Sequence, residues 1–328
     1  MQKRVLAIAQ NPVFSTAVVC IILYLVAGFT SAHFFSTRVA VNLLQDNAYL
    51  GIVAVGVTFV ILTGGIDLSV GAIIGWTTIA LASMITTHHV HPYLAMAIIL
   101  AVTTINGAIL GSLIHFFAIP PFLMTLAGLF LYRGWALLIS TSTISIDHPA
   151  FNPLSDTLLK LHTGSGNVPL RLGIFVLLAA FAIAAILTRF TAYGRSLFAI
   201  GGSENSALLM GLPVARNKTL VYAISGCFAG IAGIVATTRS AAGDALSANG
   251  LELDAIAVAV VGGTLLTGGV GGILGTLIGL LIFGIIQTVV NFHSLDAAWT
   301  RIAIGTLLLS FILLQKLLRL SRTSRQSP

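Results

Sequence analysis

The sequence predicts an all-α membrane protein of about ten transmembrane helices, and three observations carry this prediction. Of its 328 residues, 57% are hydrophobic and only 8% are charged, whereas soluble domains carry roughly 25% charged residues. Nine acidic and 16 basic side chains cannot cover the surface of a soluble protein of this length. The few charges lie at the ends of long apolar runs, so lipid is the expected solvent.

The apolar runs define the predicted helices. Crossing the hydrocarbon takes about 20 residues, and backbone polar groups in lipid must bond internally, so long apolar runs are expected to be helices. The predicted spans are 13–30, 47–62, 70–86, 93–117, 122–140, 170–188, 219–238, 253–266, 270–292 and 297–315. The second and eighth are short, and glycines interrupt the region of the ninth, so these need not be complete straight helices.

The N-terminal run is predicted to be a retained first helix. It follows Lys3 and Arg4, is long for the apolar core of a signal peptide, and is followed by Ser31-Ala32-His33, a poor small-residue cleavage site.

The basic residues predict that both termini are cytoplasmic. Lys and Arg are retained on the cytoplasmic side of membrane proteins, and an inside N-terminus places ten bases inside, five outside and Arg133 within a span. The inside set is Lys3, Arg4, Arg189, Arg195, Arg216, Lys218, Lys316, Arg319, Arg322 and Arg325; the outside set is Arg38, Lys160, Arg171, Arg239 and Arg301. This orientation puts the polar loop 141–169 outside and the loop 189–218 inside.

The sequence carries no signature of an enzyme, a metal protein or a nucleic-acid-binding protein. The net charge of +7 marks span ends rather than one folded face. His-Glu-x-x-His, Gly-x-Ser-x-Gly and the phosphate-cradling Gly-x-x-x-x-Gly-Lys-Ser/Thr pattern are absent. Cys20 and Cys227 lie in apolar runs, and the turn with His88, His89 and His91 matches no zinc spacing. We expect no catalytic residue, metal or cofactor on this chain; any ATP is bound by another chain.

Two glycine-rich segments resemble each other. LTGGIDLSVGAIIG (62–75) and LTGGVGGILGTLIG (266–279) share seven of fourteen positions. Internal repeats with glycine-broken helices are typical of transporters, although glycines also simply allow helices to pack closely. The pair indicates either structural pseudo-symmetry or close helix packing.

Polar side chains within or near the spans are candidates for a translocation path or gate. Asp67 is a functional candidate because an ionisable group near the bilayer is costly, and it also fits a cap on the helix that begins at 67–70. The full candidate set is Asn47, Asp67, Ser69, Asn106, Thr125, Glu252, Asp254, Gln287 and Asn291. The alternative role for each is an interhelical hydrogen bond.

The inside loop contains a predicted short amphipathic helix. Glu204 to Met210 alternates polar and apolar faces over about two turns, with Ser203 as a candidate N-cap. Such a helix at the membrane surface would fit a groove on a cytoplasmic partner; the alternative is a plain connection.

With these segments the chain resembles the permease subunits of bacterial ABC importers for monosaccharides, in the ribose, xylose and arabinose group. The resemblance is carried by ILTGGIDLSVG (61–71), GRSLFAIGGSENSALLMG (194–211) and LELDAIAVAVVGGTLLTGGVGGILGTLIG (251–279), and with the ten-span layout it covers nearly the whole chain. DNAYLGIVAVGVTFVILTGGIDLSVG (46–71), ISIDHP (144–149) and VVGGTLLTGGVGG (260–272) are closest to the galactofuranose permease type.

The resemblance implies a bundle like that of type II ABC importer permeases, formed by a single transmembrane domain over 1–328. It also implies a second permease subunit (the same chain or a related one), cytoplasmic ATPase subunits that carry ATP and Mg, and a periplasmic sugar-binding protein. The 141–169 loop would be periplasmic. The loop 189–218 would be the coupling element contacted by the ATPase, through Gly194, Arg195, Ala199, Gly201, Gly202, Glu204 and Gly211. The chain departs from the family pattern where Gly-Gly-Asn and Ala-Ala-Arg become Gly201-Gly202-Ser203 and Ser206-Ala207-Leu208, which removes a charge from this element.

Two rival functions follow from the same sequence. An ion-coupled secondary sugar transporter would need a protonatable residue deep in the bundle, and the acids Asp46, Asp67, Glu252, Asp254 and Asp296 lie near predicted span ends. A membrane-embedded enzyme would need paired catalytic groups, which the motif search does not find. The sequence therefore predicts a permease of the bacterial inner membrane, driven by ATP hydrolysis on a partner.

Overall fold

A computed structural model describes residues 12–31, 33–163 and 166–323. Lys3, Arg4 and Arg325, which enter the charge argument, lie outside the described residues. The first helices are α2 (Pro12–Thr30), α3 (Thr37–Asp46), α4 (Ala48–Leu62), α5 (Val70–Thr86), α6 (Pro92–Phe116) and α7 (Pro121–Ile139). The later ones are α8 (Asn152–Ser155), α9 (Leu172–Phe190), α10 (Ala192–Gly202), α11 (Glu204–Leu209), α12 (Val214–Ser240), α13 (Leu251–Val261), α14 (Ile273–Phe292) and α15 (Ala297–Thr323).

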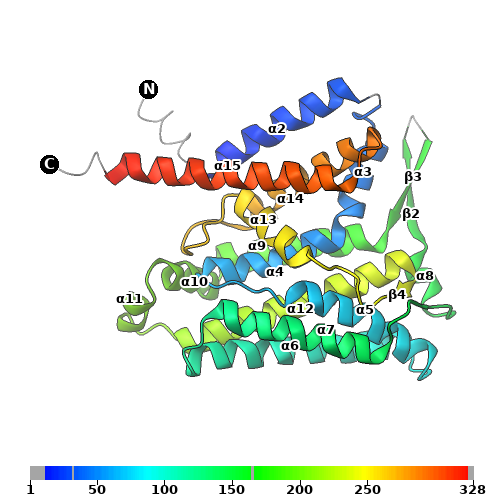
Figure 1. Cartoon of the computed structure of the whole chain (residues 1–328), viewed down its shortest axis with the longest axis horizontal. Helices are drawn as coiled ribbons and strands as arrows, with labels where there is room; N and C mark the ends of the chain where they lie inside the picture. The colour runs from blue at the N-terminus through cyan, green and yellow to red at the C-terminus, as the bar shows by residue number, and fades with distance from the viewer. Residues whose placement is uncertain (1–11, 32, 164–165, 324–328) are drawn as a thin grey trace.

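Four short strands accompany the helices in the described part of the chain. β2 (Thr157–Thr163) and β3 (Gly166–Arg171) form an antiparallel hairpin, and β1 (Ile144–Ser145) pairs with β4 (Ala242–Gly243). The hairpin lies at one end of the bundle and α11 at the opposite end (Figure 1). These are called the hairpin end and the α10–α11 end below.

The helix lengths are those of an all-α membrane protein, but they do not establish that ten helices cross the membrane. Among the described residues, six helices are long and apolar enough to cross a membrane, or seven if α3 and α4 count as one bent span. Each of the ten predicted spans overlaps a helix, but α5 has 17 residues and α13 only 11. The predicted breaks explain the difference, because glycine-rich connections over 63–69 and 262–272 shorten the helices on either side.

Helix α4 lies at the centre of the bundle. Every residue of α4 is buried except Tyr49, as expected of a helix that is apolar on all sides. It is packed by α12, α9, α13 and α14, and α12 in turn runs along α6 and α5. The core therefore forms around α4 and α12.

The helix order repeats with the spacing of the two glycine-rich segments, which are 204 positions apart. The first residues of α4 and α13, Ala48 and Leu251, are 203 positions apart, and so are those of α5 and α14, Val70 and Ile273. The starts of α6 and α15 differ by 205. This order supports the pseudo-symmetry interpretation of the repeat over the interpretation as close packing alone.

Helices α6 and α12 approach each other through glycines. A methyl group on Gly107 would overlap the carbonyl oxygen of Tyr222, and one on Gly226 would overlap that of Thr103. Small residues let helix backbones approach this closely in membrane proteins. By contrast, an added methyl at Gly134 on α7 would meet nothing within 4 Å.

We therefore expect Gly226→Val to destabilise the protein by about 1–3 kcal/mol, the usual cost of overpacking. Gly134→Val is the matched control, since it places the same residue in a helix that has room for it. Thermal unfolding of the two purified variants in one detergent checks the prediction. Equal unfolding temperatures for both variants would contradict it.

Candidate functional site

Polar side chains gather in three adjoining cavities at the hairpin end. Their volumes are about 230, 370 and 280 Å³, and all three are lined by Asp46, at the end of α3. Helix α14 lines two of them, through Gln287, Thr288 and Asn291. The surrounding helices are bent here: α3 and α4 meet at 55° around Asn47. Broken helices beside a polar cavity are the usual setting of transporter binding sites.

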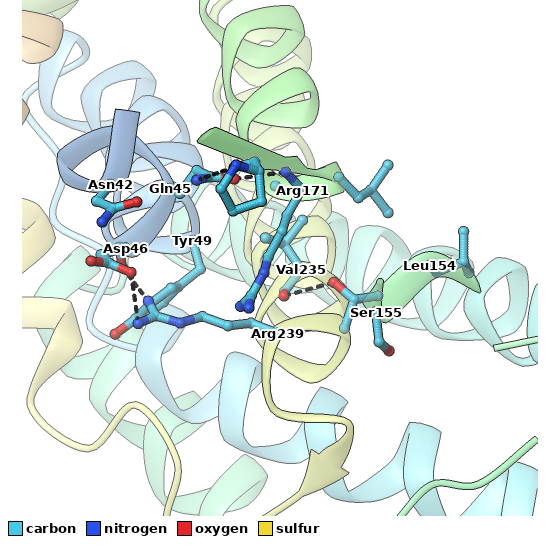
Figure 2. Close-up of a pocket in the computed structure, with 13 residues that line it drawn as sticks. Asn42, Gln45, Asp46, Tyr49, Leu154, Ser155, Arg171, Val235 and Arg239 are labelled. Carbon is cyan, nitrogen blue, oxygen red and sulfur yellow. Dashed lines mark hydrogen bonds and ion pairs between the residues drawn. The ribbon is translucent and has the colours of Figure 1, made fainter. Parts of the chain in front are cut away.

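An ion pair separates two of these cavities. Arg239, at the end of α12, contacts the Asp46 carboxylate at 3.0 Å and also donates to the Asp46 carbonyl oxygen at 2.6 Å. The side chains remain 42% and 55% exposed, and exposed pairs contribute little to stability. Figure 2 shows the guanidinium groups of Arg239 and Arg171 pointing into the same space beside Asp46. The pair thus presents charge to the cavity more than it stabilises the fold.

The polar residues around Asp46 divide into those already bonded and those that are not. Gln45 is used structurally: its amide donates to Pro169 O at 3.0 Å and its oxygen accepts from Arg171 N at 2.6 Å. Asn47 donates to Leu43 O at 2.9 Å, within the bend. Within the described part of the chain, the amides of Asn42, Gln287 and Asn291 have no hydrogen-bond partner. These three amides are available to a ligand.

Asp67 lies in the connection between α4 and α5 and is 2% exposed. One carboxylate oxygen accepts from Ser69 N at 3.0 Å and Ser69 Oγ at 2.6 Å, and the other accepts from Ser225 Oγ of α12 at 2.7 Å. Helix α5 begins at Val70 with Ser69 at the N-cap position, so Asp67 fixes the turn before the helix rather than capping its first turn. Ser225, which the sequence analysis missed, connects this turn to α12.

Two further predicted residues lie near the start of α5. Thr125 donates to Ile66 O at 3.2 Å and to Pro121 O at 2.9 Å, which attaches α7 to the Asp67 turn. Glu252 is 9% exposed, and one of its oxygens packs against Gly71 without a hydrogen-bond partner in the described structure. Asp67 and Glu252 thus lie near helix ends, as predicted, but those ends are buried in the bundle.

Arg133 is held by the segment before α13. It donates to Ala245 O at 2.7 Å and Ser247 O at 3.0 Å, passing over Gly75 of α5. A side chain at Gly75 would collide with this arginine, so the glycine is required for the contact.

The two repeated glycine turns meet at the α10–α11 end. Gly269 N–H donates to Leu62 O at 3.0 Å, which joins the second turn to the end of α4. Gly64 and Gly268 have φ of +79° and +80° and lie against each other, a conformation that glycine adopts without strain. Gly201 of α10 packs against the end of α4 and against the second glycine turn, since an added methyl group would overlap Leu62 O and Gly269 N. We call Gly64, Gly201, Gly268 and Gly269 the glycine junction.

Helices α10 and α11 form a short projection beside this junction. The predicted helix after Ser203 is confirmed: α11 spans Glu204–Leu209, and Ser203 Oγ accepts from Ser206 N at 3.3 Å. Glu204 pairs with Lys218 of α12 at 2.6 Å, and Gly211 ends the turn with a φ of +75°. Gly194 donates to Thr191 Oγ1 at 3.1 Å, which fixes the start of α10.

The outer side of this projection is apolar. Leu208, Leu209 and Met210 are 50%, 89% and 65% exposed, and Arg195 is exposed while Ala199 is half-buried on α10. Exposed apolar patches of this kind mark interaction surfaces.

The structure thus brings some predicted path residues together and leaves others apart. Asn47, Gln287 and Asn291 share the 370 Å³ cavity, while Asp67, Ser69 and Thr125 form a separate buried cluster. Asn106 and Asp254 line none of these cavities. The sequence analysis missed the pairing of Asp46 with Arg239, because nothing local connects residues 193 positions apart.

Comparison with known proteins identifies the family of the chain. It matches the family model described as "Branched-chain amino acid transport system / permease component" over residues 39–312. It is 45% identical to the inner membrane ABC transporter permease protein YjfF of Escherichia coli K12, over 96% of this chain and 95% of that protein. The chain is 36% identical to the fructose import permease protein FruG of Bifidobacterium longum, over 92% of this chain and 89% of that protein. It is 35% identical to the ribose import permease protein RbsC of Bacillus subtilis, over 90% of each. No solved structure matches the chain.

These matches cover nearly the full length, so the chain belongs to this family of transport-system permease components. It is a multi-pass membrane permease and not an enzyme.

The Asp67 cluster generates a prediction about energetic coupling. Asp67→Ala removes the acceptor of three hydrogen bonds, and Ser225→Ala removes one donor. Because the two side chains share a buried bond, we expect the double variant to be less destabilised than the sum of the single variants, by about 0.5–3 kcal/mol. Thermal unfolding of the four proteins in detergent measures this, and strictly additive effects would sink the assignment.

Proposed function

We propose that this chain is the membrane-spanning permease subunit of an ATP-driven importer that moves a monosaccharide across the bacterial inner membrane. The observation that carries this proposal is similarity over about nine-tenths of the chain to permeases named for ribose and fructose import. Its partners would be a cytoplasmic ABC ATPase that binds ATP and Mg, a periplasmic sugar-binding protein, and a second permease subunit, identical or related.

The polar cavities at the hairpin end support a sugar over a branched-chain amino acid. Unbonded amides and an ion pair face the 370 Å³ cavity. An apolar amino acid side chain would leave such groups unpaired on desolvation, at a cost of about 1–3 kcal/mol each, whereas sugar hydroxyls both donate and accept. The family description names amino acids, but this lining favours a polyhydroxylated substrate.

We infer that ten segments cross the membrane with both termini in the cytoplasm. The α10–α11 end would then face the cytoplasm, which agrees with Arg195 and Lys218 at that end, and the hairpin would be periplasmic. The short α5 and α13 would be parts of discontinuous spans, which suits a transporter.

The α10–α11 projection would be the coupling element for the ATPase. Its exposed tip of Leu208, Leu209 and Met210 suits a hydrophobic groove, and Leu208 stands where the resembling family carries Arg. Docking would therefore depend on apolar burial more than on charge. Movement of α10 would reach both repeats at once through the glycine junction. A ligand shifts the populations of two conformational states of the permease only if it binds them with different affinity.

The narrower proposal is that the sugar is galactofuranose. It rests on the segments 46–71, 144–149 and 260–272, which resemble the galactofuranose permease type. Uptake competition among galactofuranose, ribose and fructose would separate this sugar from the substrates named for the relatives.

The energy source is tested by uptake of labelled monosaccharides into vesicles that contain the permease, its ATPase and its binding protein. If ATP drives transport, a protonophore at constant ATP leaves uptake unchanged, and ATP depletion abolishes it. The buried acids Asp67 and Glu252 give the ion-coupled alternative a physical basis, and loss of uptake with the protonophore at constant ATP would favour that alternative.

The glycine junction predicts a difference between two adjacent residues. A methyl group at Gly201 overlaps backbone atoms of both repeats, whereas one at Gly202 meets nothing within 4 Å. Overpacking costs about 1–3 kcal/mol. If this cost falls on the state in which α10 is coupled to both repeats, it raises the transport barrier and lowers the transport rate roughly ten- to hundredfold. We expect this loss for Gly201→Ala, with continued ATP hydrolysis by the complex, and near-normal uptake for Gly202→Ala. Equal uptake by both variants, at equal abundance in the membrane, would contradict the coupling role.

A further inference from the structure

The adjoining cavities between α3, α12 and α14, which share Asp46, together have the composition of a carbohydrate site. We propose that they form a monosaccharide subsite in which Asp46 and Arg239 bind neighbouring hydroxyl groups, and Asn42, Gln287 and Asn291 bind the remaining ones. This inference rests on the proposed function and identifies the site within this chain where the sugar first binds.

A sugar hydroxyl both donates and accepts, so its partners must offer both functions. The Asp46 carboxylate only accepts, the Arg239 guanidinium only donates, and each amide does both. An ion pair at 3.0 Å therefore presents an acceptor and a donor at a spacing that suits two adjacent hydroxyls.

Gln287 and Asn291 are four residues apart on α14, and Asn42 and Asp46 are four apart on α3. Residues at this spacing lie on one face of a helix. Both pairs line cavities that share Asp46, so two helices present polar groups to one space.

These groups have no other role in the described structure. Gln45 and Asn47, from the same region, are bonded to the backbone and hold the hairpin and the helix bend. Asn42, Gln287 and Asn291 are unbonded, and the Asp46–Arg239 pair is half-exposed. Polar groups near a membrane that stabilise nothing are candidates for ligand contacts.

Tyr49 completes the site. It is the one residue of α4 that is not buried, and it lines the 230 and 370 Å³ cavities on both sides of the ion pair. A tyrosine has an apolar ring with a polar tip, which suits the C–H face and hydroxyl edge of a sugar ring. With Arg171 the site carries one acid and two bases, so its charge excludes a cationic substrate.

The test is protection of introduced cysteines by sugar. In a chain with Cys20→Ser and Cys227→Ser, the substitutions Asn42→Cys, Gln287→Cys and Asn291→Cys are made one at a time. Asn249→Cys is the matched control, because Asn249 is exposed and lines none of these cavities. Each complex of permease and ATPase is reconstituted into vesicles and treated with a membrane-impermeant thiol reagent, with ribose, fructose, galactofuranose or leucine present.

We expect the sugar that the wild-type complex with its binding protein transports to slow modification at the three cavity positions at least threefold. Modification at Asn249→Cys stays unchanged, and leucine protects no position. Unchanged modification rates at all three cavity positions in the presence of a transported sugar overturn the subsite and leave the proposed function standing. Transport and protection by leucine, or ATP-dependent uptake of none of the sugars, overturns the proposed function and the subsite together.

Discussion

The backbone hydrogen bond from Gly269 N–H to the Leu62 carbonyl oxygen joins the second glycine turn to the end of α4. The last carbonyl groups of a helix have no partner within that helix, and Leu62 ends α4, the most enclosed helix of the bundle. The second glycine turn supplies the missing donor. The two turns come this close because Gly268 lacks a side chain, which would overlap Gly64 N, and because both Gly64 and Gly268 adopt positive φ. The repeated LTGG sequence thus satisfies a backbone requirement.

This junction also determines how the α10–α11 end can act on the rest of the molecule. Gly201 lies against the carbonyl and amide of that hydrogen bond, and α10 continues into the exposed tip of α11. A force applied at the tip would act on α4 and on the turn before α14 together. The Asp67 cluster extends the connection, because the residues that follow the first glycine turn are tied to α12 by Ser225 and to α7 by Thr125.

The sequence was sufficient for the features that depend on local pattern. Apolar run length predicted where helices lie and that the second and eighth spans are short, and Ser203 predicted the start of α11. The number of complete spans did not follow, because length and apolarity cannot decide whether a 17-residue or an 11-residue helix crosses the bilayer. The pairing of Asp46 with Arg239 and of Asp67 with Ser225 joins distant positions, and no periodicity records such contacts.

Asp67 and Asp46 lie in different surroundings. Asp67 accepts three hydrogen bonds in a site that is 2% exposed, and each bond fixes a backbone turn or a neighbouring helix. A carboxylate so fully engaged has little capacity left for a substrate. Asp46 is more than half exposed and pairs with a single arginine beside unbonded amides. Substrate hydroxyls could therefore engage Asp46 without breaking the fold, whereas engaging Asp67 would release α5 from α12.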